Sequence, residues 1–411
     1  MKKIILRNVG LFCVFVSLFS LFSCKNKNVV SSVKKETLFN LQYGSFENQL
    51  NLLNLANTGM IDTSIAMKNG FFYISNGNAK KLLEINSYGD LLTLYYNNET
   101  SVAPSLEEAV TTGNENIGAS TRKSVSYAFN SPNLVAVDNR QYVYVTETLP
   151  KERQEYEDSK ALWQIVLRFN SNSFVDYIGQ NGPGGLPFPY IRNIYTTADN
   201  ELVVVCIVMK GLEVYCFSPE GKLIHSVTIE SDKVPNPYQK EMEEPMFVTV
   251  ENIIPDYQDD KLWVKIDYSA VYTNEVSRVN SGIEYLHTLL YPLDITSGVY
   301  GEPIEVPAYE ESVESDFTKQ IYKQPYDFLG VTSNGWFFFS IPTSNGYVIQ
   351  MINQSQSQVI KRLLPIDHSQ IMYSNFNLSD TGIISALLAH RDKAEVVWWR
   401  TDLFIDSLLK S

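Results

Sequence analysis

The chain has 411 residues, a formal net charge of −13 and 44% hydrophobic residues, with 25 tyrosines and 21 phenylalanines. This content can bury a large core and excludes a disordered chain, and the wealth of aromatic residues favours strands. An acidic surface repels phosphate backbones and anionic lipid headgroups. We therefore exclude a nucleic-acid partner and expect no membrane contact through surface charge.

The first 23 residues have the features of an export signal. Lys2, Lys3 and Arg7 precede an uncharged apolar run at 9–22. This length is typical of a signal peptide and short for a transmembrane helix. Its removal takes away three positive charges and no negative one, so the net charge would fall from −13 to about −16. We predict that residues 1–23 are a signal peptide.

The sequence Leu21-Phe22-Ser23-Cys24 resembles a bacterial lipobox. The resemblance implies that Cys24 is the lipid attachment site and that its acyl chains, palmitate included, hold the protein on a membrane. The alternative is a plain signal peptide with an incidental cysteine. Residues 24–35 are polar and are predicted to be a flexible tether. The expected location is the cell envelope, facing the periplasm or the cell surface.

Residues 36–411 are predicted to form one β-propeller domain. The clearest unit lies at 131–181, where turn residues separate four short apolar strands at 134–137, 142–145, 163–169 and 174–178. Such a four-stranded antiparallel sheet cannot bury both faces by itself. Weaker copies along the chain therefore indicate a ring of similar sheets.

The copies give an all-β fold, a β-propeller of six four-stranded antiparallel blades, with seven blades as the alternative. The other predicted strands are 64–67, 71–74, 81–85 and 91–95; 191–196, 202–208, 212–218 and 223–229; 247–253, 261–268, 285–291 and 303–306; 326–331, 335–342, 346–352 and 359–364; and 374–378, 382–389 and 394–400. The strand at 38–41 is expected to complete the last blade, whose own fourth strand is ragged. A short amphipathic helix is expected within 309–323.

Two insertions interrupt the regular spacing, at 97–124 and 150–160. The first has few large apolar residues and a possible helical turn at 105–110, and the second is a charged loop. Loops on a rigid ring often carry function. We expect these two insertions to face a partner.

The second unit resembles the repeat of NHL-type six-bladed propellers. The resemblance lies in Ser131-Pro132-Asn133-Leu134 and the strand that ends at Asp138, in the strand 141–147, and in the strand from Gln164 to Phe169. The family usually has a glycine where Asn133 and Leu134 stand. The whole chain is similar to propeller lipoproteins of spirochaete-type bacteria, a family that implies a fold more than a function.

Cys206 and Cys216 lie on neighbouring strands on either side of Lys210-Gly211. A three-residue loop would let the two residues face each other and form a disulfide. A two-residue loop would pair Cys216 with Val205 and place the thiols on opposite faces. We favour two buried free thiols.

No catalytic residue and no cofactor or metal site is predicted. The four histidines, His225, His287, His368 and His390, lie in no recognisable catalytic or metal motif. A Ca²⁺-dependent hydrolase of the lactonase type would hold its ion at the central channel through oxygen ligands. Candidate ligands near predicted inner-strand starts are Asp62, Asn133, Asp138, Asn193 and Asp327. We favour a role for these residues in turns.

Two further patterns are explained by structural roles. The glycine-rich stretch at 179–185 precedes no helix and is expected to link two blades instead of binding phosphate. The aromatic runs at 336–339 and 398–399 are expected to pack in the core, although some members could line a carbohydrate-binding surface. The sequence thus predicts a monomeric, lipid-anchored binding or scaffold module with a protein partner in the envelope. The alternative function is the calcium-dependent hydrolase.

Overall fold

The computed structural model describes residues 30–52, 61–99, 122–157, 160–170, 173–239, 246–273, 280–315, 318–353, 355 and 358–409. The predicted signal peptide, Cys24 and most of the insertion at 97–124 lie outside these residues. Within them, no helix is long and apolar enough to cross a membrane.

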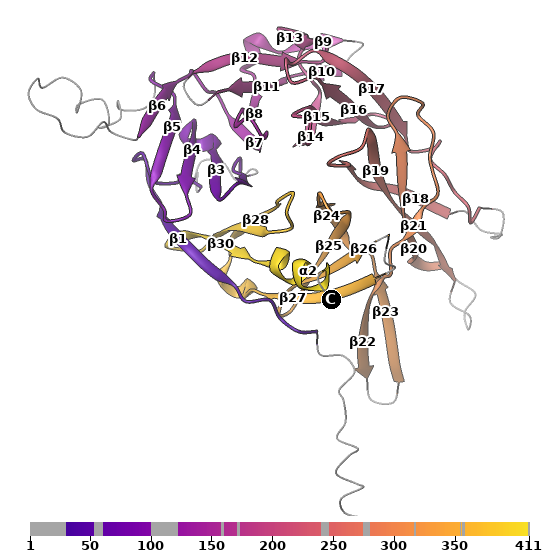
Figure 1. Cartoon of the computed structure of the whole chain (residues 1–411). Helices are drawn as coiled ribbons and strands as arrows, with labels where there is room; N and C mark the ends of the chain where they lie inside the picture. The colour runs from indigo at the N-terminus through magenta and orange to yellow at the C-terminus, as the bar shows by residue number, and fades with distance from the viewer. Residues whose placement is uncertain are drawn as a thin grey trace, which may run out of the picture.

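The protein is a six-bladed β-propeller, as Figure 1 shows. Blade 1 contains β2 (Ile65–Lys68), β3 (Phe71–Asn76), β4 (Lys81–Asn86), β5 (Leu91–Tyr96) and β6 (Lys123–Ser126). Blade 2 contains β7 (Pro132–Val137), β8 (Val143–Thr148), β11 (Gln164–Phe169), β12 (Phe174–Gly179) and β13 (Gly182–Pro183). Blade 3 contains β14 (Tyr190–Thr196), β15 (Leu202–Val208), β16 (Gly211–Phe217) and β17 (Leu223–Glu230).

The second half of the ring has the same plan. Blade 4 contains β18 (Met246–Pro255), β19 (Lys261–Thr273), β20 (Asn280–Asp294) and β21 (Ile304–Glu305). Blade 5 contains β24 (Asp327–Val331), β25 (Trp336–Thr343), β26 (Gly346–Asn353) and β27 (Gln358–Pro365). Blade 6 contains β28 (Tyr373–Leu378), β29 (Ile384–Ala389), β30 (Lys393–Trp399) and β1 (Glu36–Gln42).

The remaining elements of the described residues lie outside the blade strands. They are the hairpin β9 (Glu155–Glu157) and β10 (Lys160–Leu162), the hairpin β22 (Tyr309–Ser315) and β23 (Thr318–Gln324), the helix α2 (Thr401–Leu409), and three short 3-10 helices at Gly77–Ala79, Lys151–Arg153 and His368–Gln370. The insertion predicted at 150–160 therefore contains a 3-10 turn and the start of the β9–β10 hairpin.

The six predicted blades are confirmed, and the residues of their turns explain where the strands begin and end. Between β2 and β3, Asn69 and Gly70 have φ values of 53° and 80°, the left-handed conformation that a tight hairpin needs. Each blade is antiparallel along its four main strands. The exception is β6, a fifth strand that runs parallel to β5.

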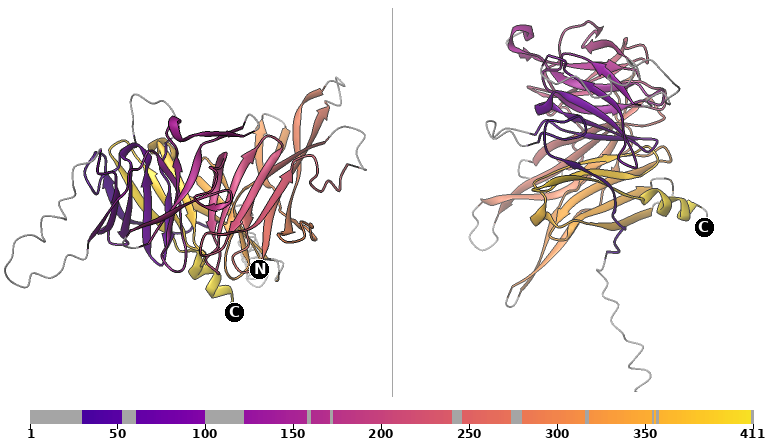
Figure 2. Two further views of the ribbon diagram at one scale, coloured as in Figure 1. Left: turned by 90° about the horizontal axis from the view of Figure 1, so that it is seen from above. Right: turned by 90° about the vertical axis from the view of Figure 1, so that its left-hand side faces the viewer.

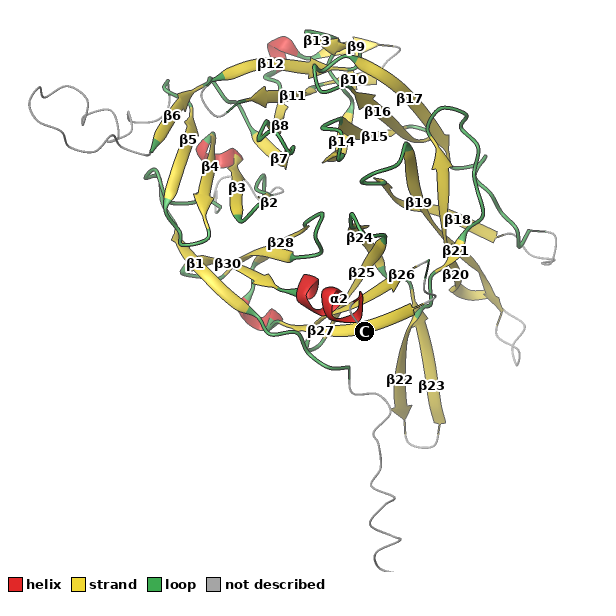
Figure 3. Ribbon diagram, in the orientation of Figure 1, coloured by secondary structure: helices red, strands yellow, loops and turns green. Residues whose placement is uncertain are grey.

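Two local predictions were wrong. Residues 309–323 form most of the β22–β23 hairpin and contain no helix among the described positions. The end of the chain, predicted as a ragged strand, is the helix α2 beside blade 6 (Figure 3). Both segments are short and mix polar with apolar residues, and neither has clear turn residues. Such a pattern does not distinguish a strand from a helix.

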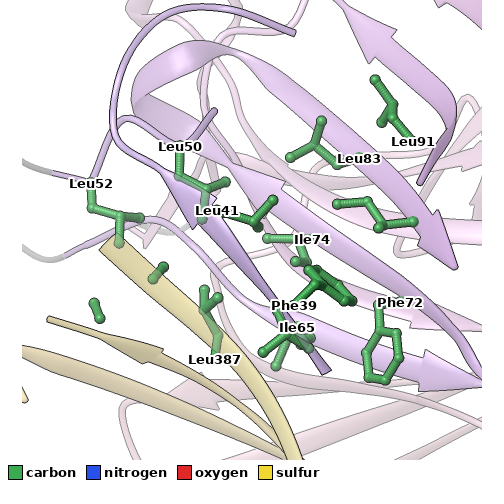
Figure 4. Packing of buried hydrophobic residues seen from close by; sticks show 14 of the residues in the cluster. Phe39, Leu41, Leu50, Leu52, Ile65, Phe72, Ile74, Leu83, Leu91 and Leu387 are labelled. Carbon is green, nitrogen blue, oxygen red and sulfur yellow. The ribbon is translucent and has the colours of Figure 1, made fainter. Parts of the chain in front are cut away.

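The ring closes by pairing its first strand with its last blade. β1 runs antiparallel to β30, so blade 6 takes its outer strand from the N-terminal part of the chain, as predicted. Figure 4 shows the hydrophobic core between blades 6 and 1. There, Phe39 and Leu41 of β1 lie near Phe72 of blade 1 and Leu387 of blade 6. Pairing and packing thus join the two ends of the chain.

The hydrophobic core lies between blades, because both faces of each sheet are apolar. The run Trp336–Phe339 alternates: Trp336 and Phe338 pack toward blade 6, and Phe337 and Phe339 pack toward blade 4. Each of the four is at most 2% exposed. Core packing is therefore confirmed for this run.

Part of the predicted tether is attached to the ring. The Val33 amide donates to Leu363 O (2.9 Å) and the Leu363 amide donates to Ser31 O (3.1 Å), so residues 31–33 run parallel to the outer edge of β27. The chain then continues into β1. The views in Figure 2 show the strands of blade 4 extending beyond the rest of the ring; its β19 and β20 have 13 and 15 residues.

Candidate functional site

The first strands of all six blades surround a central channel. Its cavity of about 320 Å³ is lined by residues of β2, β7, β14, β18, β24 and β28 and by the turns that follow some of them. Each of these strands is the inner edge of its blade and presents backbone groups that no neighbouring strand of its own sheet can bond.

Side chains from adjacent blades satisfy many of these edge groups. Asn375 Oδ1 accepts from the Ile65 amide (2.9 Å) and Asn377 Oδ1 accepts from the Met67 amide (3.0 Å), which joins blade 6 to blade 1. Asn252 Nδ2 donates to Phe328 O (3.1 Å), joining blade 4 to blade 5. The channel amides therefore hold the ring together.

One end of the channel carries a polar network to which every blade contributes. Lys68 Nζ lies 3.1 Å from Asp380 Oδ2 and donates to the Tyr257 hydroxyl (3.3 Å). The Tyr257 hydroxyl donates in turn to Asn139 Oδ1 (3.1 Å). Blades 3 and 5 join through Asn200 Oδ1, which accepts from the Asn139 amide (2.9 Å), and through the Ser333 amide, which donates to Asp380 O (2.8 Å).

The five candidate calcium ligands do not converge on one point. Asp62 and Asn133 are adjacent, with Asn133 Nδ2 at 3.4 Å from Asp62 Oδ1, while Asn193 Nδ2 donates to Asn252 Oδ1 (3.2 Å). Asp327 lies at the start of β24 in blade 5. Among the described residues, no group of three or more His, Cys, Asp or Glu could hold a metal ion.

Asp138 is not at the start of an inner strand, contrary to the prediction. It directly follows β7, is fully buried and pairs with Arg140 at 3.1 Å. Its Oδ1 also accepts from the amides of Arg140 (2.9 Å) and Tyr142 (2.8 Å). These contacts are those of an aspartate that caps the β7–β8 turn.

A buried ionic cluster lies within blade 4 near the other end of the channel. Lys265 Nζ is fully buried, with both Asp267 carboxylate oxygens at 2.8 Å and Glu251 Oε2 at 3.4 Å. Thr288 Oγ1 donates to Asp267, and the Tyr285 hydroxyl donates to Thr288 Oγ1 (2.9 Å). Polar contacts thus run outward through blade 4.

Two β-bulges bring Arg192 and Glu251 together at the channel side of this cluster. Arg192 and Glu251 are the extra residues where the β14–β15 and β18–β19 registers shift. A bulge turns a side chain away from its regular face, and here the Arg192 guanidinium lies 4.0 Å from Glu251. Burial raises the pKa of Glu251, against the opposing effect of Lys265, and burial also raises the pKa of Asp327. Sequence alone had no signal for the two bulges.

The histidines lie apart from one another. His225 is in β17, His287 stacks on Tyr238 with ring centres 4.7 Å apart, His368 Nε2 lies 3.3 Å from Gly346 O, and His390 Nε2 lies 3.4 Å from Glu395. Their separate positions give no pair that could act together on a metal or a nucleophile.

Cys206 and Cys216 are buried free thiols on opposite faces of blade 3. The favoured prediction of two buried free thiols is confirmed. The loop has two residues, as in one of the two alternatives, but it is Met209-Lys210, so Cys216 pairs with Val203 instead of Val205. Burial raises the pKa of Cys216 to about 12, which makes the thiol unreactive.

A large cleft lies between blades 4 and 5, outside the channel. Its volume is about 980 Å³, and its walls come from β20, β21, the β22–β23 hairpin, β26, β27 and residues Val30 and Ser31. Tyr285, the outer end of the ionic cluster in blade 4, lines it. A volume of this size is typical of ligand-binding sites.

The sequence did not reveal this cleft, because it depends on the hairpin that was read as a helix. One signal was present: acidic residues on one side of 316–317 and basic residues on the other. In the structure Glu310 pairs directly with Lys323 across the hairpin. Opposite charges placed symmetrically about a turn favour a hairpin.

No protein-family model matches the sequence, and no curated protein is found to be similar to it. Solved structures align along most of the chain. The polysaccharide lyase Uly1 aligns with a TM-score of 0.41 and 8% identity, over 91% of this chain and 94% of that one. A gluconolactonase of Xanthomonas campestris aligns with a TM-score of 0.38 and 11% identity, over 90% and 97%.

Hydrazine synthase of Kuenenia stuttgartiensis aligns with a TM-score of 0.38 and 11% identity, over 82% of this chain and 80% of that one. These three proteins differ in their named activities, and their scores and identities are low. We transfer no activity from them, since one fold hosts many functions.

Proposed function

We propose that the protein is a lipid-anchored β-propeller of the cell envelope that acts as a scaffold for binding a protein or another ligand. The proposal combines the lipobox-like sequence ending at Cys24 with the resemblance to NHL-type propellers and spirochaete-type lipoproteins. It includes a monomeric propeller, a membrane contact made through the lipid and an envelope protein as the partner.

The cleft between blades 4 and 5 is the observation that carries the binding role. A hairpin leaves the ring there and forms a wall of a space of about 980 Å³. The asparagines of the channel, by contrast, use their amides to join neighbouring blades. A surface for a partner is therefore proposed at the cleft and its hairpin, in addition to the insertions at 97–124 and 150–160.

The test is affinity purification of the tagged protein from its own envelope in mild detergent, with mass spectrometry of the bound proteins and analysis of bound calcium. We expect a stoichiometric partner and no calcium. A protein that purifies alone and carries calcium would instead favour the lactonase-type hydrolase at the channel.

The anchor is tested separately. Cys24→Ser should release the protein from membranes, because the thiol that would carry the lipid is removed. A Ser23→Ala variant, which keeps the cysteine and a small residue before it, should stay in the membrane fraction. Retention of the Cys24→Ser protein on membranes would contradict the anchoring proposal.

A further inference from the structure

The cleft between blades 4 and 5 exists because blade 4 has a very short outer strand. β21 has 2 residues, whereas the outer strands of blades 3 and 5, β17 and β27, each have 8. In the described part of the chain, β21 pairs only with Leu289 and Leu290 of β20. The rest of that edge has the isolated bridge between Leu293 and Tyr300 and the Val306 amide, which donates to Thr288 O (3.0 Å). The face of blade 5 that is turned toward blade 4, with Val348 of β26 and Lys361 of β27, borders the resulting space.

Lys361 is a half-buried cation without an ion-pair partner. Among the described residues no carboxylate lies within 4 Å of its Nζ, and Glu310 is the carboxylate that influences its charge without such a contact. The two most buried ion-paired lysines of the ring differ: Lys68 has Asp380 at 3.1 Å and Lys265 has Asp267 at 2.8 Å. Burial lowers the pKa of Lys361, and Glu310 acts in the opposite direction.

Two more polar groups beside Lys361 lack partners. Gln350 is its direct neighbour across β26 and β27; its Nε2 donates to Pro307 O (3.0 Å), but its buried Oε1 has no hydrogen bond among the described residues. The Tyr326 ring lies 5.7 Å from Lys361 Nζ, and its buried hydroxyl is also without a bond. Buried polar groups left this way are costly. Neither residue lines the cleft, so Lys361 is the member of this group that a ligand in the cleft would meet.

The outer edge of β27 already accepts an extended chain. Residues 31–33 pair with it at Leu363. Alternation along an antiparallel strand places the backbone groups of Val359 and Lys361 on the same edge as those of Leu363. The Lys361 carbonyl there accepts from Arg362 Nη1 (2.8 Å), a side-chain contact that another strand could replace.

The rim of the cleft has the opposite charge from its floor. The rim is mainly acidic: Glu305, Glu310 and Glu311 are exposed there, and the one exposed lysine among the lining residues, Lys323, stands directly opposite Glu310 in the hairpin. The floor carries Lys361 and Arg362. A long polyanion would be repelled by this rim. A single carboxylate that reaches Lys361, flanked by neutral or basic residues, fits both charges.

We propose that this cleft binds an extended peptide segment of a partner protein that places one acidic side chain on Lys361, with neutral or basic residues on either side. The peptide would lie along β27 by adding a strand to the sheet edge. This proposal rests on the proposed scaffold function and names the chemistry of its partner.

The test uses two mixtures of acetylated, amidated heptapeptides with neutral and lysine residues at the flanking positions. One mixture has glutamate at the centre and the other has glutamine. Binding to the detergent-solubilised full chain is measured by competition with a fluorescent peptide selected from the glutamate mixture. The variants are Lys361→Met and Lys361→Gln, with Lys222→Met in an exposed turn of blade 3 as the matched control.

The glutamate mixture should bind at least tenfold more tightly than the glutamine mixture. This preference should disappear in both Lys361 variants and persist in Lys222→Met, with thermal melting showing that all three are folded. Absence of a preference, or its persistence without Lys361, would overturn the proposal.

The chain's own N-terminal segment is the competing occupant, since Val30 and Ser31 line the cleft. Deletion of residues 25–29 should leave the affinity for the glutamate mixture unchanged. A tenfold gain on deletion would show that this segment fills the cleft and would overturn the proposal for a partner peptide. An envelope protein that co-purifies but is not displaced by the peptides would overturn this inference and leave the scaffold function standing.

Discussion

The indole of Trp398 donates a hydrogen bond to Glu36 Oε2 over 2.9 Å, and the two residues are direct partners in the pairing of β1 with β30. The start and the end of the domain therefore form a single sheet. Phe39 extends this closure into the core, where its ring meets Phe72 of blade 1 edge-on at 5.7 Å. Stability of the ring should depend on this short strand.

Phe39→Ala is expected to lower the free energy of unfolding by about 3–5 kcal/mol, because it leaves a cavity between blades 6 and 1. Asn40→Ala replaces an exposed neighbour in the same strand. It should alter the free energy of unfolding by no more than about 0.5 kcal/mol. Urea denaturation followed by tryptophan fluorescence compares the two. Similar midpoints for both variants would show that β1 is dispensable for closure.

Asn377→Leu should weaken the junction of blades 6 and 1 at the channel. The change removes the acceptor of the Met67 amide, and an unsatisfied buried N–H costs about 1–3 kcal/mol. Hydrogen exchange measured by mass spectrometry should show faster exchange in β2. The Ser374→Ala variant lies in the same strand and should leave exchange in β2 as it is; an unchanged rate in Asn377→Leu would contradict the role given to the channel amides.

Glu147 should make the protein less stable as the pH rises from about 4.5 to about 7. Burial raises the pKa of its carboxyl from 4.5 to about 7, although the amides of Asn130 and Ser131, Lys80 and Arg153 act in the opposite direction. Its Oε2 is buried and has no hydrogen bond among the described residues. The folded state thus keeps a proton that the unfolded state loses in this interval, and stability falls with pH until both states are ionised.

At about 1.36 kcal/mol per pH unit, this group alone makes the protein about 3 kcal/mol more stable at pH 4.5 than at pH 8. Glu147→Gln cannot ionise and should remove most of this difference. Urea denaturation of both proteins at pH 5 and pH 8 measures it. A variant with the full pH dependence of the original protein would show that Glu147 ionises normally.

Lys265→Met should lower the free energy of unfolding by about 3–5 kcal/mol, because the change leaves the Asp267 and Glu251 carboxylates buried without their cation. Adding Asp267→Asn should recover part of the loss, since one of the two charges is then removed. Lys261→Met serves as the control: it lies at the start of the same strand, and its side chain is half-buried and paired with Asp259, which is itself exposed. A loss no larger than that of the control would mean that the ionic cluster contributes little to stability.

The blades could be predicted from the sequence because each turn depends on a few residues that are adjacent in the chain. Asn69-Gly70 and the turns of blade 2 separate short apolar segments, and each segment is long enough for one strand. The role of the segment at 38–41 was also predictable, since the last blade lacked a good fourth strand. These features depend on neighbours in the chain.

The candidate site depends on contacts between distant segments, and the sequence did not reveal them. Asn375 and Asn377 use their amides on the edge of another blade, 310 positions away. Glu251 reaches Lys265 from a bulge that no composition rule marks. Asp138 was placed at the wrong end of its strand because an aspartate that begins a turn and one that begins a strand look alike in sequence.

Site-specific photo-crosslinking in the native envelope tests the proposed binding function most directly. A photoreactive phenylalanine would replace Ile321, a 56% exposed residue of β23 that lines the cleft, and in a separate protein Val175, a 39% exposed residue of β12 in blade 2. The scaffold proposal predicts one major crosslinked protein from position 321, several times stronger than any from position 175. Equal yields from both positions, or none from position 321 in a folded and membrane-bound protein, would contradict it.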